Sequence, residues 1–107
     1  MYQEKQWLKR KIHDISDNLI KVSREYWLSD ENDPFNKTRA LEIKCNLQDI
    51  ELYSTKLNVN VTDEIKHLMQ YITGGDFENS DRKSISPKDD KFFHISQHIC
   101  SLKMKTF

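Results

Sequence analysis

Residues that break regular secondary structure are rare in this chain. Its 107 residues include two glycines, Gly74 and Gly75, and two prolines, Pro34 and Pro87. A β-sandwich or barrel needs turn residues about every 8–12 positions, and a phosphate loop needs a glycine-rich pattern, so the sequence excludes both. The four breakers leave long uninterrupted segments, which predict an all-α fold.

An excess of charge of one sign is also absent. The 17 Lys and Arg residues balance 17 Asp and Glu residues, whereas a general nucleic-acid binder carries a clear excess of basic residues. No apolar run approaches the roughly 18 residues that span a bilayer, and no apolar segment of a signal peptide follows the N-terminus. We therefore expect one cytoplasmic domain over residues 1–107, of bacterial or phage origin, that binds no nucleic acid.

Apolar residues recur at helical spacing, most regularly in the first part of the chain. A helix over about residues 2–28 is predicted by an unbroken seam with gaps of three and four residues. Its members are Leu8, Ile12, Ile15, Leu19, Val22 and Tyr26.

A second helix is predicted over about residues 34–57. Asp33 suits its N-cap and Pro34 its first position, with Asn36 as an alternative start. Its apolar residues form two rows, so we expect it to lie in the middle of the domain, with Cys45 buried as a small apolar residue. The rows are Ala40, Ile43, Leu47, Ile50 and Leu57, and Leu41, Cys45 and Leu52.

Two further helices complete the predicted bundle. A short one over about 62–73 has an amphipathic face and ends before Gly74, a suitable C-cap. The last, over about 87–104, begins with Ser86 as N-cap and Pro87 at its first position. The sequence therefore predicts a small antiparallel bundle of three long helices and one short helix.

The predicted loop over residues 75–86 is polar. Phe77 and Ile85 are the two residues that could hold it to the bundle. Because so few apolar residues stabilise its ordered state, we expect this loop to be the most mobile internal segment.

Two histidines on the last predicted helix are the candidate metal ligands. His94 and His98 form an H-x-x-x-H pair, so both imidazoles could reach one ion. The H-E-x-x-H pattern of zinc proteases and the Glu-x-x-His pairs of di-iron bundles are absent. The two cysteines, Cys45 and Cys100, are too few for a zinc motif and indicate reduced thiols, with Cys100 off the apolar seam of its helix. We therefore expect no catalytic residue and no cofactor.

A basic cluster opens the first helix, at Lys5, Trp7, Lys9, Arg10 and Lys11. Cations are mildly unfavourable at the N-terminal end of a helix. The cluster could instead serve as a patch for a membrane surface or a phosphate group, with Trp7 at the interface.

The first helix has more apolar surface than one seam needs. Trp7, Ile20, Trp27 and Leu28 lie beside the row that ends at Tyr26. Large aromatic residues left at a surface are the usual anchors of an interface. We expect these five residues to bind a protein partner, either as a homodimer or in a hetero-complex.

These patterns favour a non-enzymatic helical module for protein–protein interaction, of adaptor, inhibitor, immunity or regulatory type. The first alternative is the cytosolic domain of a membrane-anchored or membrane-surface-binding protein. The second is a metal-binding or enzymatic bundle that uses His94 and His98.

Overall fold

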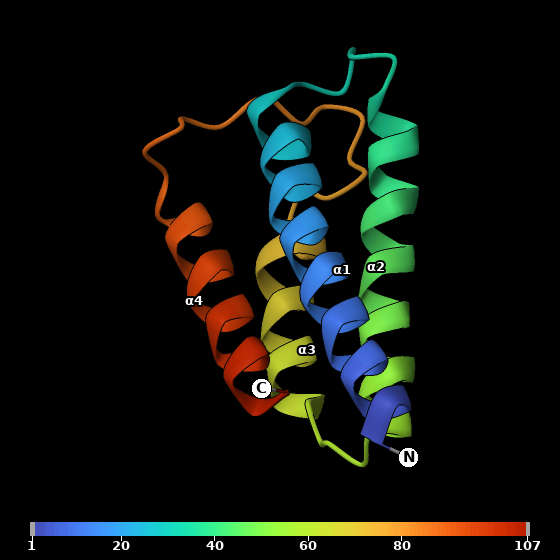
Figure 1. The fold of residues 1–107 in the computed structure, drawn as a ribbon. Coiled ribbons are helices and arrows are strands. Elements are labelled where there is room, and N and C mark those ends of the chain that lie inside the picture. Colours follow the sequence, from blue (N-terminus) through green and yellow to red (C-terminus); the bar gives the residue numbers. More distant parts are fainter. Residues whose placement is uncertain (1, 107) are drawn as a thin grey trace.

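The computed structural model describes residues 2–106 and confirms the all-α bundle. In chain order the elements are α1 (Tyr2–Leu28), α2 (Asn36–Lys56), α3 (Thr62–Leu68), the π-helical turn η1 (Met69–Thr73) and α4 (Asp90–Lys105). Figure 1 shows consecutive helices running antiparallel, with α1 between α2 and α4 and with α3 behind it. The central helix is therefore α1, and the expectation that the second helix lies in the middle is wrong.

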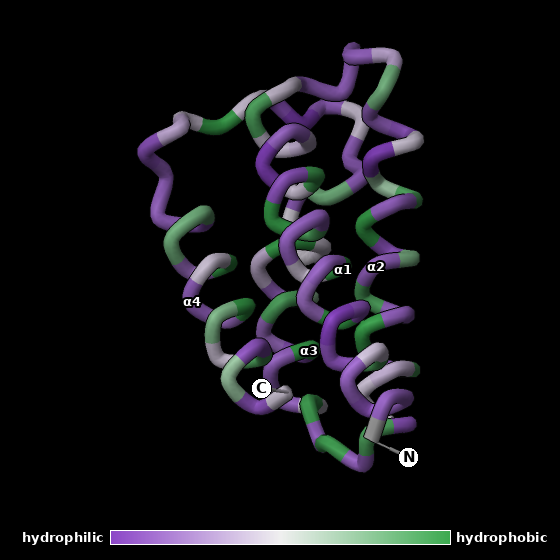
Figure 2. Tube along the Cα trace, viewed as in Figure 1, coloured by the Kyte–Doolittle hydropathy of each residue, from purple (hydrophilic) through white to green (hydrophobic). Residues whose placement is uncertain are grey.

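Most of the buried apolar residues of the bundle belong to the predicted seams, and Trp27 and Val61 are buried in addition. Hydrophobic and hydrophilic residues alternate along every helix (Figure 2), as amphipathic helices require. One continuous cluster joins the four helical segments and η1. Its fully buried side chains include Ile12, Leu19, Ile43, Ile50, Leu68, Ile72, Ile99 and Leu102.

Two helix starts differ from the prediction or decide between alternatives. The second helix begins at Asn36, because the Asp33 carboxylate accepts a hydrogen bond from the Phe35 backbone N–H (2.9 Å) and closes a turn before it. The last helix begins at Asp90 and is capped by Asp89, whose Oδ1 accepts from the Lys91 N–H (2.8 Å). Ser86 is the predicted cap, but its backbone carbonyl oxygen accepts a hydrogen bond from the Asp89 N–H. It therefore belongs to a separate turn before the helix.

Both glycines are needed where the short helical segment ends. Gly74 follows η1 as expected, and a Cβ atom there would lie 2.4 Å from the Gln70 carbonyl oxygen, which is too close for any side chain. Gly75 adopts a φ of +60°, a backbone conformation that glycine reaches without steric cost. The two residues turn the chain from η1 toward the end of α1.

The loop after η1 is packed against α1 through Phe77 and Ile85, the two residues expected to hold it, and the expected mobility of residues 75–86 stays a prediction. The Phe77 ring lies 4.9 Å from that of Tyr26, and the Ile85 N–H donates to the Trp27 carbonyl oxygen at 3.0 Å. The main anchor is Arg82, whose side chain is 1% exposed. Its Nε donates to Glu31 Oε1 at 2.8 Å, and its guanidinium lies 4.2 Å from the centre of the Tyr26 ring.

The ion pair with Arg82 changes the pKa of Glu31. Burial raises the pKa of Glu31, but the hydrogen bonds from Arg82 and Tyr26 outweigh it, so that the net shift is downward. The carboxylate therefore contributes stability above its ordinary pKa, and this contribution is lost as the pH falls through the lowered value.

Replacing Arg82 with Ala should lower the free energy of unfolding by about 2–3 kcal/mol, because it removes one partner of a largely buried ion pair together with the contact to Tyr26. Urea unfolding followed by circular dichroism measures the change. Lys83→Ala is the matched control, since the neighbouring side chain is exposed, and should stay within about 0.5 kcal/mol of the unmodified protein. Equal stability of the two variants would contradict the anchoring role.

Candidate interaction surface

The five residues predicted to bind a partner do not form one surface. Tyr26 and Trp27 are 1% and 3% exposed, so the expectation that they remain at the surface is wrong. Ile20 packs against the core, and Leu28 is half-buried. Of the five, Trp7 is largely exposed, and its ring meets Tyr53 of α2 edge-on at 6.0 Å.

The aromatic end of α1 is covered by segments that come much later in the chain. Trp27 Nε1 donates to the Ile72 carbonyl oxygen at 3.1 Å, so η1 satisfies the buried indole. The loop that carries Phe77 and Arg82 packs over the remaining face. The extra apolar surface of α1 is therefore used inside the molecule.

An exposed apolar row runs along α2 instead. Leu41 and Leu52 are 63% and 50% exposed, and Cys45 and Gln48, also exposed, lie between them. These four residues, which we call the α2 outer row, follow gaps of four, three and four residues. The expectation that Cys45 is buried is wrong, because α2 lies at the edge of the bundle and turns its second apolar row outward.

A groove adjoins this row. It lies between α2 and the α3–η1 segment, has a volume of about 480 Å³, and includes Gln48 of the α2 outer row on its edge. Leu47, Ile65 and Phe77 contribute apolar lining, and the half-exposed Met69 stands on its far side. Methionine adapts its shape to different partners, so this lining suits a binding groove.

A second exposed row follows the outer side of α4. Phe93 and Met104 are 67% and 74% exposed, with the exposed Gln97 and Cys100 between them. We call these four residues the α4 outer row; its gaps are again four, three and four residues. Cys100 lies away from the core side of α4, as expected, and both thiols are free.

Both cysteines should therefore react in the folded protein. Because Cys45 and Cys100 are exposed and unpaired with each other in the separate chain, we expect two thiols per chain to be titrated by Ellman's reagent in dilute solution without denaturant. A Cys45→Ser variant should leave one reactive thiol. Reaction of Cys45 only after addition of urea would show that α2 buries its second row after all.

The histidine pair of α4 belongs to a stack of four rings at the α3–α4 interface. His94 stacks on Tyr71 at 4.7 Å, Tyr71 on His98 at 5.4 Å, and His98 on His67 at 4.7 Å between ring centres. The Tyr71 ring therefore contacts both imidazoles of the H-x-x-x-H pair. Among residues 2–106, no group of three His, Cys, Asp or Glu side chains is arranged to hold a metal ion.

The stack makes one imidazole hard to protonate. Burial lowers the pKa of His98, the nearby His67 and His94 lower it further, and Glu64 acts in the opposite direction. A histidine with a lowered pKa binds a proton less readily in the folded chain than in the unfolded chain. Folding is then penalised as the pH falls from about 6.5 toward the lowered pKa.

We therefore expect the free energy of unfolding to decrease between pH 7.5 and pH 5.5, and His98→Gln to make this dependence shallower. Urea unfolding at four pH values in this window measures both slopes, and the window stays above the ordinary pKa of the carboxylates. Ser96→Gln places the same side chain at an exposed position of α4 and should keep the original slope. A pH dependence unchanged by His98→Gln would show that this imidazole is not the titrating group.

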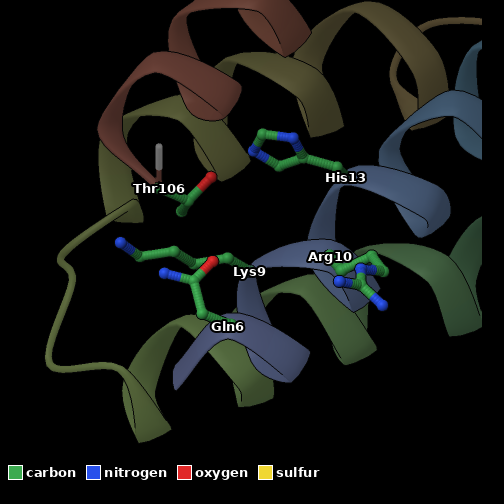
Figure 3. A pocket seen from close by; sticks show the side chains of 5 residues that line it. All are labelled: Gln6, Lys9, Arg10, His13 and Thr106. Carbon is green, nitrogen blue, oxygen red and sulfur yellow. The ribbon is translucent and has the colours of Figure 1, made fainter. Parts of the chain in front are cut away.

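Two residues of the basic cluster, Lys9 and Arg10, line a depression beside α1. Figure 3 shows Lys9, Arg10, His13 and Gln6 of α1 around a depression that Thr106, after the end of α4, closes on the other side. The depression has a volume of about 520 Å³. Trp7 does not line this depression, and its ring contacts Tyr53 of α2.

None of the described helices is long and apolar enough to cross a membrane. Comparison of the chain with protein-family models, with curated proteins and with solved structures finds no match.

Proposed function

We propose that this protein is a non-enzymatic interaction module that binds a helix of another protein chain along the α2 outer row. One observation carries the proposal: Leu41 and Leu52 are more exposed than large apolar side chains need to be in a bundle whose core is complete without them. Exposed leucines that stand alone are common, but aligned ones at helical spacing mark a surface that a second helix can cover.

The spacing of the row indicates the kind of partner. Gaps of four, three and four residues are those of the seam by which two helices pack at a small crossing angle, and three of the four residues in this row, Leu41, Cys45 and Leu52, are apolar. The apolar groove beside Gln48 adds depth, because side chains at the edge of a docked helix would enter it. A partner helix with its own apolar seam therefore fits this face.

The charged residues beside the row would affect which partner helix binds more than how tightly it binds. Lys37, Lys44, Glu42, Asp49 and Glu51 surround it and include both signs. Mixed charges at the rim of an apolar strip contribute little affinity, but they disfavour partners with mismatched charges.

The test compares single substitutions that place a charge on exposed apolar positions. Leu41→Glu and Leu52→Glu should each reduce capture of the partner from a lysate of the source cells by tenfold or more, since a carboxylate cannot be buried in an apolar seam without a counterion. Phe35→Glu is the matched control: Phe35 is 65% exposed, similar to Leu41, but precedes α2 and lies outside the row. Quantitative mass spectrometry of the captured proteins gives the ratio.

All three variants should keep the urea midpoint of the parent chain, because the replaced side chains are exposed. A protein retained equally by all three variants would show that binding uses another face. Loss of capture with Phe35→Glu as well as with Leu41→Glu would also contradict the assignment to the α2 outer row.

A further inference from the structure

The two outer rows match each other residue by residue when one is reversed. An antiparallel pairing of the α2 outer row with the α4 outer row brings like residues together in four successive layers. The layers are Leu41 with Met104, Cys45 with Cys100, Gln48 with Gln97, and Leu52 with Phe93. All eight side chains are exposed in the single chain.

From this match we infer that the helix that docks on the α2 outer row is α4 of a second copy of the protein, in antiparallel orientation. The inference rests on the proposed function and names its partner.

Each layer is chemically sound. The outer layers pair large apolar side chains, which lose water on contact. In the inner layers two carboxamides can each donate to and accept from the other, and two thiols pack as small apolar groups. A parallel pairing would keep the apolar layers but would set each thiol against a carboxamide, which leaves part of the amide's hydrogen-bonding capacity unused.

The surroundings of the α4 outer row allow close approach. The exposed Ser96 and Ser101 flank its two inner positions, and such small side chains do not hold a second helix away. On α2 the corresponding flanks carry Lys44 and Asp49, one charge of each sign. Lys44 is already paired with Glu78 at 2.8 Å.

The position of the two rows in the bundle decides the type of assembly. Helices α2 and α4 lie on opposite sides of the molecule and run in the same direction (Figure 1). One copy therefore cannot use both rows on the same neighbour, and an antiparallel contact inverts each copy relative to the next. The contact is heterologous, and it continues from copy to copy instead of closing as a two-fold dimer.

The two cysteines provide a test of this register. Packed helices with axes about 8–10 Å apart bring facing Cα atoms to about 3.4–5.4 Å, which overlaps the range that a disulfide spans. Oxidation with diamide would join Cys45 of one copy to Cys100 of the next. Two thiols lose two protons and two electrons, and the diazene bond of diamide takes them up to give the hydrazine.

Serine variants distinguish this pairing from every symmetric one. Cys45→Ser and Cys100→Ser, each oxidised alone, should remain monomeric on a non-reducing gel, while an equal mixture of them should give a disulfide-linked dimer and no larger species. The unmodified protein should give a ladder of multimers, because each copy has both thiols. Dimers of either variant alone would overturn the inference in favour of a two-fold contact between like rows.

A further substitution excludes random collision as the source of the dimer. Adding Leu41→Glu to the Cys100→Ser chain should slow dimer formation with the Cys45→Ser chain at least fivefold, whereas adding Phe35→Glu should leave the rate unchanged. Equal rates for the two, or no dimer in the unmodified mixture, would reject a second copy as the partner. If capture of a different protein still depends on Leu41 in that case, the proposed function stands and this inference alone fails.

Discussion

Arg82 lies against the rings of Tyr26 and Trp27 and beside the carboxylate of Glu31, and the rest of the bundle depends on this contact. The end of α1 presents two large aromatic side chains, of which Trp27 also contacts Ile72 of η1 and Lys91 of α4. The loop after η1 covers them, using a guanidinium that contacts aromatic faces and forms an ion pair at the same time. Through it the later part of the chain is fixed to the first helix, which positions α4 on the side of α1 opposite to α2.

The fold could largely be predicted from the sequence because a seam with gaps of three and four residues permits one regular structure. The seam from Leu8 to Tyr26 predicts α1, and all of its members except the partly buried Ile15 are buried. The position of α2 could not be predicted in the same way. Its two apolar rows are compatible with a central helix buried on both sides and with an edge helix that exposes one row, and only the packing of α1 between α2 and α4 decides between them.

The candidate surface was missed for a related physical reason. Sequence patterns indicate which residues are apolar but not how much surface the remaining elements cover. The apolar pattern of α1 leaves Trp27 without a cover, because its cover is a backbone carbonyl of η1 and a charged residue of a polar loop. The pattern of α2 predicts a buried Cys45, because its row is apolar at Leu41 and Leu52. In both cases the deciding partners lie far away in the sequence, and periodicity carries no information about them.

The composition of the two outer rows limits how strongly they can bind. A row of four large apolar residues on each side of a small bundle would promote indiscriminate association, whereas these rows have apolar residues at their ends and a thiol and a carboxamide between them. A buried carboxamide without a partner costs free energy, so Gln48 and Gln97 disfavour any register in which they meet an apolar side chain. The carboxamide layer therefore reduces affinity and selects one alignment, as a single polar layer does in a coiled coil. Such a surface suits a contact that forms with one matched helix and leaves the separate chain free of a large apolar patch.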